Sequence, residues 1–236
     1  PATLFVAQAQ GATLTCADGV HYADFCLGDT GAMFGHSPAP LAQAIAAQAA
    51  RGLTCMLPAT NAATVGAMLS DTFGLPMWQM ALSASDANRF VLRWARAITG
   101  RPQLLVFDGC YHGAVDDTLV DMDAVTGGTL PRSSVLGQVH NHAAFTRVVP
   151  FNDLAALEAA LARGDVACLL AEPALTNFGL VPPHDGYWPA ARELCRRHGT
   201  LFVMDETHTI STALGGYARA HGLEPDAGVV GKAVAG

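Results

Sequence analysis

Three short segments of this sequence are apolar along almost their whole length: QLLVF at 103–107, VACLLAE at 166–172 and TLFVMDE at 200–206. A strand with one face in water alternates apolar and polar residues, so an uninterrupted apolar strand indicates burial on both faces. Helix-like segments, DLAALEAALARG and YWPAARELCRRHG, precede the second and third strands. The alternation predicts an α/β fold with a mainly parallel sheet flanked by helices.

The rest of the chain extends this pattern. Short strand-like pieces open the sequence, with a hairpin signal at Asp18-Gly19. Further strands are predicted at 78–82 and 229–230, and further helices at 41–52, around 60–74 and at 87–100. Residues 123–146 are rich in Gly, Pro, Ser and Asn and predict one long loop.

Composition excludes several classes of protein. A net charge of -7 and the lack of a basic run argue against a nucleic-acid partner. Glu172 and Pro173 interrupt the longest apolar stretch, so no membrane span is expected. Six widely spaced cysteines, without a CxxC pair, predict buried thiols in a reducing compartment, and we expect a cytoplasmic protein.

Polar side chains follow the predicted strands. In an open parallel sheet, ligands bind beyond the carboxyl ends of the strands. The residues at these ends are Ser83, Ala84 and Ser85, then Tyr111 and His112, then Glu172, then Asp205, Thr207 and His208, and finally Lys232. Hydroxyls, an aromatic ring, carboxylates, a histidine and a lysine at one edge indicate a site for chemistry.

Most of these residues also have a structural interpretation. Ser83 is a favoured helix N-cap, and the free N–H groups of the same helix end can bind phosphate. Tyr111 is either a core aromatic or a platform for a flat ligand, and His112 is either structural or catalytic. Asp205 ends an apolar run, where a carboxylate braces a loop or holds a protonated ring nitrogen.

Lys232 is the only lysine in the chain, whereas arginine occurs twelve times. It lies between Gly231 and Ala233, in a run without another polar side chain. An apolar setting lowers the pKa of an amine and frees a nucleophile, although a surface lysine is the simpler alternative. A phosphate cup, an aromatic platform, a buried Asp and a reactive lysine together are what pyridoxal 5′-phosphate requires.

The order of these motifs resembles the class-III aminotransferases of the pyridoxal-phosphate fold-type I superfamily, most closely the glutamate-1-semialdehyde aminomutase branch. The similarity runs over nearly the whole chain. The segments that carry it are DGVHYADFCLGDTGAMFGHSPAPLAQAI, ARGLTCMLPAT, SASDANRFVLRWARAITGR, FDGCYHG, AEPALTNFGLVPP, DETHT and GGYARAHGLEPDAGVVGKAVAG.

The resemblance implies a role for each site residue. Lys232 is the Schiff-base lysine and Asp205 the partner of the pyridine nitrogen, the two catalytic residues. The other cofactor-binding candidates are Ser83, Ala84 and Ser85 for phosphate, Tyr111 and His112 beside the ring, Thr207 on its other face, and either His208 or Asn177 near the phenolic oxygen. No metal site is expected.

The sequence also departs from the aminomutase pattern. Ala84 adds a methyl group where the family has a glycine, and the stretch LTCMLPAT makes an apolar substrate wall. The loop at 123–146 shares little with the aminomutase gating loop. These departures favour transfer of an amino group from an amine or a (β-)amino acid to a keto acid. Aminomutase chemistry and a non-catalytic pyridoxal-phosphate-binding homologue remain alternatives.

The resemblance also predicts the organisation of the protein. Residues 1–50 are expected to form strands and a helix of a small domain or interface segment, and 51–236 a large cofactor-binding domain that is incomplete at its C-terminus. We expect parts of the N- and C-terminal segments to lie outside this sequence. A homodimer is implied, with a small-molecule amino donor and a keto acid as partners. Arg51 and Arg89 are poor candidates for the family's carboxylate-binding arginine.

Overall fold

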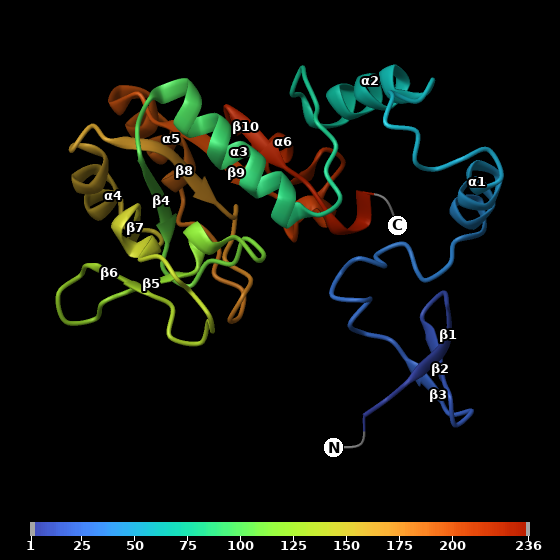
Figure 1. The fold of residues 1–236 in the computed structure, drawn as a ribbon. Coiled ribbons are helices and arrows are strands. Elements are labelled where there is room, and N and C mark those ends of the chain that lie inside the picture. The colour runs from blue at the N-terminus through green and yellow to red at the C-terminus, as the bar shows by residue number, and fades with distance from the viewer. Residues whose placement is uncertain (1–2, 235–236) are drawn as a thin grey trace. The chain divides into compact units, whose positions relative to one another are not determined.

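The computed structural model describes residues 3–234 (Figure 1). This part of the chain divides into two units. One unit contains the residues up to Met68 and those from Gly231 onward, and the other is Leu69–Val230. The domain boundary predicted between residues 50 and 51 stays a prediction.

The first unit begins with a three-stranded antiparallel sheet of β1 (Val6–Gln10), β2 (Thr13–Cys16) and β3 (His21–Ala23). These strands confirm the prediction from the opening sequence. The carboxylate of Asp18 accepts a hydrogen bond from the N–H of Val20 in the expected turn. The predicted helices follow as α1 (Ala39–Ala49) and α2 (Ala62–Phe73), and residues 69–73 of α2 already belong to the second unit.

The second unit is built on a parallel sheet with the strand order β10-β9-β8-β4-β7. Its strands are β4 (Gln103–Phe107), β7 (Thr146–Val149), β8 (Val166–Ala171), β9 (Leu201–Asp205) and β10 (Ala227–Val229). The chain passes from β4 to β7 on one side and returns past β4 to β8 on the other. The crevice at such a reversal, beyond the carboxyl ends, is where open α/β sheets bind ligands.

Helices cover this sheet on both faces. All six residues of β8 are buried, and successive side chains of a strand point to opposite faces. The helices are α3 (Ala84–Thr99), α4 (Leu154–Leu161), α5 (Tyr187–His198) and α6 (Gly216–Ala220). Helix α3 packs on β8 and β10, whereas α4 and α5 contact each other and β7 and β9 (Figure 1). The predicted α/β architecture is confirmed.

Two expectations for the elements are wrong. Residues 78–82 form no strand; they have no pairing partner among the described residues, and the indole of Trp78 donates to the carbonyl of Leu75 instead. The segment 123–146 is not wholly a loop, because β6 (Thr129–Pro131) pairs with β5 (Val120–Met122) as a short hairpin. Four 3-10 turns complete the described chain: Asp116–Thr118, His142–Ala144, Thr209–Thr212 and Lys232–Val234.

The six cysteines are all free, but they do not all fit the expectation of buried thiols. Cys26 and Cys55 are exposed, because they lie in the loops around α1, where little packs over them. Within residues 3–234, no helix has the length and apolar character needed to cross a membrane.

Candidate active site

Asp205 lies at the carboxyl end of β9, and four donors hold its carboxylate. Its Oδ2 accepts from Nδ2 of Asn88 at 2.8 Å and lies 2.9 Å from Nδ1 of His112. Its Oδ1 accepts from the backbone N–H of Thr207 at 3.0 Å and from the Thr207 hydroxyl. Only 3% of the residue is exposed, and a carboxylate at that depth is stable only with such partners.

Asp205 and His112 form a buried ion pair. Burial opposes the charge of Asp205, but the contacts with His112, Thr207 and Asn88 outweigh it and hold the pKa of the carboxyl below its ordinary value of 3.8. Burial likewise opposes the charge of His112, but Cys110 and Asp205 raise its pKa well above the ordinary value of 6.5. Both shifts favour the charged forms of the pair, the carboxylate of Asp205 and the protonated imidazole of His112.

The N-terminus of α3 lies against the loop that follows β4. Ser83 caps the helix, since its hydroxyl accepts from the N–H of Asp86 at 3.1 Å. The hydroxyl of Ser85 accepts from the N–H of Ala114 at 3.0 Å. A Cβ atom at Gly113 would lie 2.1 Å from that hydroxyl, so only glycine allows this approach. The first N–H groups of a helix have no acceptor within it, which leaves those of Ala84 and Ser85 for a ligand.

A second buried carboxylate, Glu172, follows β8 and holds the same loop. Its Oε1 accepts from the backbone N–H of Tyr111 at 3.0 Å, and only 4% of the residue is exposed. The loop from Cys110 to Gly113 is thus fixed by carboxylates from β8 and β9. Tyr111 is 47% exposed, so it is not a core aromatic.

Glu172 also connects to His208. Its Oε2 accepts from the hydroxyl of Thr176 at 2.7 Å, and that hydroxyl is in hydrogen-bond contact with Nδ1 of His208. Asn177, the alternative candidate, is exposed and its side chain makes no hydrogen bond within residues 3–234. Of the two candidates, His208 is the one that the structure joins to the buried network.

Lys232 lies at the start of the last 3-10 turn, with a backbone φ of +53°. Its Nζ donates to the backbone carbonyl of Asp29 and to Oδ2 of the same residue, both at 2.6 Å. The expectation of an apolar setting is therefore wrong, because the loop after β3 brings a carboxylate to this amine.

The sequence model of the family described as Aminotransferase class-III matches residues 1–236, which is the whole chain. The chain belongs to this family. The resemblance inferred from the motifs is thereby confirmed, together with the pyridoxal-phosphate fold type that it implied.

Several class-III relatives are similar over nearly the full chain. A glutamate-1-semialdehyde 2,1-aminomutase of Sorangium cellulosum is 36% identical over 238 residues, 99% of this chain and 54% of the relative. The crystal structure of a glutamate-1-semialdehyde-aminomutase from Pseudomonas aeruginosa PAO1 is 55% identical with a TM-score of 0.95, over 99% of this chain and 51% of that one. A second structure under that name, 54% identical, is a complex with PMP.

A transaminase is also a structural neighbour. The omega-transaminase from Sphaerobacter thermophilus is 26% identical with a TM-score of 0.92, over 99% of this chain and 55% of that one. The chain thus spans about half the length of the curated relatives it matches. Family membership and fold follow from these comparisons, whereas substrate and activity have to be argued from the residues.

Three residues that contact the predicted site residues were missed from the sequence. The side-chain amide of Asn88 donates to Oδ2 of Asp205 and to the backbone carbonyl of His112. The sequence pattern that could have indicated this role is a polar residue at helical spacing from Leu92 and Ala95, two buried residues of α3. Thr176 links Glu172 to His208. Asp29 lies 203 positions before Lys232, and no local pattern in the sequence relates the two.

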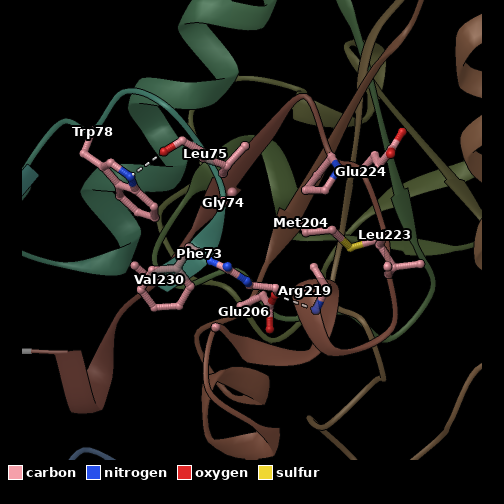
Figure 2. Close-up of a pocket in the computed structure, with 15 residues that line it drawn as sticks. Phe73, Gly74, Leu75, Trp78, Met204, Glu206, Arg219, Leu223, Glu224 and Val230 are labelled. Carbon is pink, nitrogen blue, oxygen red and sulfur yellow. Dashed lines mark hydrogen bonds between the residues drawn. The ribbon is translucent and has the colours of Figure 1, made fainter. Parts of the chain in front are cut away.

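A cavity of about 330 Å³ lies elsewhere in the second unit, between the segment 73–78, β10 and α6 (Figure 2). Met204 and Glu206 line it, whereas Asp205 between them does not. Because neighbouring side chains of a strand point to opposite faces, this cavity is separate from the Asp205 network. Glu206 caps α6 there, accepting from the N–H groups of Tyr217 and Ala218.

Proposed function

We propose that the protein is a pyridoxal-phosphate-dependent aminotransferase that moves an amino group from an amine or a (β-)amino acid to a keto acid. The observation that carries this proposal is the buried, ionised Asp205, on the strand that pairs with the one leading to Lys232. The proposal includes a homodimer, as expected from the family, and a cytoplasmic setting, which the six free cysteines support.

The residues at this sheet edge fit the cofactor. The acceptor sites of the Asp205 carboxylate are filled by four donors, so a protonated ring nitrogen needs one of them to leave. The Thr207 hydroxyl can rotate away, whereas the backbone N–H of Thr207 cannot. The free N–H groups of Ala84 and Ser85, with the hydroxyls of Ser83 and Ser85, suit a phosphate group. Tyr111 offers an exposed ring for stacking.

When bound, pyridoxal phosphate supplies an aldehyde that joins a lysine amine and a ring that stabilises negative charge at the substrate carbon. In this proposal the amine of Lys232 would take the proton from the substrate carbon and deliver it to the carbon that was the cofactor's aldehyde carbon. The amine must first leave its two hydrogen bonds with Asp29. Asp205 keeps the proton on the ring nitrogen, and His112 and Asn88 keep Asp205 charged and fixed.

A second candidate is internal transfer of the amino group, as in an aminomutase. It is favoured by the 55% identity to a protein whose structure is described as a glutamate-1-semialdehyde-aminomutase. Transfer between two molecules is favoured by the residues of this chain. Ala84 replaces the expected glycine at the helix end, and the stretch 53–60 is bulky and apolar. An exposed apolar wall suits a hydrophobic or aromatic donor.

The first test is the visible absorbance of the purified protein after incubation with pyridoxal phosphate and removal of the excess. We expect a band that persists in the wild type and is absent from Lys232→Ala. Arg163→Ala, which removes an exposed cation of the second unit, is the control and should retain the band. A band of equal strength in Lys232→Ala would exclude this lysine as the attachment point. We expect the loss of its amine to lower kcat by at least about 100-fold.

The second test separates transamination from aminomutase chemistry. A panel of amines and β-amino acids is incubated with the protein in the presence and absence of a keto acid, and products are analysed by mass spectrometry. We expect continuous turnover only with the keto acid. Turnover of glutamate-1-semialdehyde without an acceptor would show the aminomutase instead. A retained band with no conversion of any donor would indicate a non-catalytic homologue.

A further inference from the structure

The network that ends at His208 contains a threonine hydroxyl that lies between a carboxylate and an imidazole nitrogen. Thr176 follows β8 and His208 follows β9. The hydroxyl of Thr176 lies 2.7 Å from Oε2 of Glu172 and within hydrogen-bond distance of Nδ1 of His208. The other oxygen of Glu172 accepts from the N–H of Tyr111. The segments that follow β8 and β9 therefore meet at this hydroxyl, and Glu172 connects it to the loop after β4.

The number of hydrogens decides the direction of these bonds. A threonine hydroxyl carries one hydrogen and two lone pairs, and an ionised glutamate can only accept. The hydrogen of Thr176 must therefore go to Glu172. If Nδ1 of His208 carried no hydrogen, it would face a lone pair of the Thr176 oxygen, which is repulsive. Nδ1 must consequently carry its own hydrogen and donate it to Thr176.

This assignment leaves Nε2 as the nitrogen with the lone pair in the neutral imidazole. Nε2 makes no hydrogen bond within residues 3–234, and it is not among the buried polar atoms that lack a partner. It is therefore open to water or to a ligand. His112 differs, because its Nδ1 faces the carboxylate of Asp205 directly and its Nε2 is buried. The two histidines of the site have different electrostatic environments and different roles.

We propose that Glu172 and Thr176 fix the tautomer of His208 so that its Nε2 presents a hydrogen-bond acceptor to a donor group of the bound ligand, a hydroxyl or an ammonium. Thr176 is a positioning residue in this arrangement, and His208 makes the ligand contact. The identity of the ligand rests on the proposed function, whereas the tautomer rests only on the network within this chain. An amide side chain at 208 would present a donor as readily as an acceptor, so histidine here selects the ligand's protonated oxygen or nitrogen.

The tautomer is tested by solid-state NMR of the purified, cofactor-free protein labelled with [15N]histidine. The resonances of His208 are assigned by their loss in His208→Gln. At a pH where the ring is neutral, we expect the Nδ1 resonance to be that of a protonated nitrogen and the Nε2 resonance that of an unprotonated one. The reverse pattern would overturn the assignment.

Two variants of Thr176 test the positioning role. Thr176→Ser keeps the hydroxyl and should keep the wild-type pattern. Thr176→Val has nearly the same shape but removes the acceptor, so we expect the Nε2–H tautomer to become populated. Circular dichroism confirms that each variant folds, and Thr176→Ala replaces valine if that variant does not. An unchanged pattern in a folded variant without the hydroxyl would show that Thr176 does not fix the tautomer.

The ligand contact is tested by adding pyridoxal phosphate to the same set of proteins. We expect the visible band of Thr176→Val to shift in wavelength relative to the wild type, and that of Thr176→Ser to coincide with it. A tautomer change in Thr176→Val without any change of the band would exclude the contact between Nε2 and the ligand. If no protein of the set binds pyridoxal phosphate, both the proposed function and the proposed ligand contact are contradicted. The NMR result on the tautomer of His208 does not depend on this outcome.

Discussion

Asp205 and His112 are two ionisable residues whose pKa values the fold moves in opposite directions. Contacts with His112, Thr207 and Asn88 lower the pKa of Asp205 despite its burial, and Cys110 and Asp205 raise that of His112 despite its burial. Each shift is a coupling between ionisation and folding. The acid stabilises the fold above its unfolded pKa of about 3.8 and loses that contribution as the pH falls through its lower folded value. The histidine contributes fully below about 6.5 and loses its contribution as the pH rises through its higher folded value.

The pair should therefore contribute its full stability between about pH 4 and pH 6.5. We predict that His112→Gln lowers the free energy of unfolding by about 3–5 kcal/mol in this window, because it leaves a buried carboxylate without its cation. The deficit relative to the wild type should shrink at lower pH and at pH values well above 6.5. Urea unfolding of the cofactor-free protein at a series of pH values measures it. His140→Gln, at an exposed position, is the control. A deficit that does not vary with pH would contradict the ion pair.

At the scale of single residues, the sequence predicts chemistry that is local and misses chemistry that depends on distant contacts. Asp205 was predictable, because a carboxylate that ends an apolar strand needs partners. Its partner His112 was among the candidates, but the sequence left open whether it was structural or catalytic. The contact of Lys232 with Asp29 could not be predicted, since Asp29 lies in a run of four successive positive-φ residues, 27–30, which carries no periodic signal.

At the scale of elements, helix α3 combines two roles that the sequence left open. Its N-cap, Ser83, is part of a reciprocal arrangement in which the Ser83 hydroxyl also donates to Asp86, whose charge Arg89 balances. Capping alone accounts for these contacts. Phosphate binding requires in addition that the N–H groups of Ala84 and Ser85 face a ligand. The two roles can be separated with a second helix of the same unit, α4, which Asp153 caps in the same way by accepting from the N–H of Ala156.

We predict that Ser83→Ala and Asp153→Ala each lower the free energy of unfolding by about 1 kcal/mol, the usual effect of losing a helix cap. Only Ser83→Ala should also weaken retention of pyridoxal phosphate, measured by the loss of visible absorbance during dialysis. Equal retention in the two variants would mean that the end of α3 is capped but does not hold the phosphate group. Because both variants lose a helix cap, a difference in cofactor retention between them cannot come from the loss of a cap alone.

The elements of the sheet were predictable where packing on both faces imposes continuous apolar sequence. The predicted strand at 103–107 coincides with β4, and those at 166–172 and 200–206 contain β8 and β9. The edge strand β7 was missed, because its sequence TRVV carries an arginine that bonds to Asp165 at the rim of the sheet. The apolar run at 78–82 has the composition of a strand but no neighbour to pair with among the described residues. Whether an apolar run forms a strand depends on a neighbouring strand to pair with, and the local sequence does not contain that information.

At the scale of the whole molecule, burial is distributed very unevenly between the two units. Nearly all fully buried side chains lie in Leu69–Val230, where Phe107, Trp188 and Phe202 belong to one aromatic cluster. In the first unit Cys16 is buried, whereas helix α1 has no buried residue. Phe25 and Met56 are almost completely exposed. An apolar surface of this kind supports the proposal that a second copy of the chain covers it.

This distribution leads to a prediction for hydrogen exchange. Amides of β4, β8 and β9 open only with the unfolding of the second unit, so their exchange should be slow and independent of protein concentration. Amides of α1 are held by helical hydrogen bonds without a packed core, so they should exchange rapidly in dilute solution. If a second copy covers them, their exchange should slow as the protein concentration is raised, and mass spectrometry of proteolytic peptides resolves the segments. Slow exchange of α1 at the lowest concentration, equal to that of β8, would mean that the first unit is stable by itself, and the exposed apolar side chains would then no longer support a dimer.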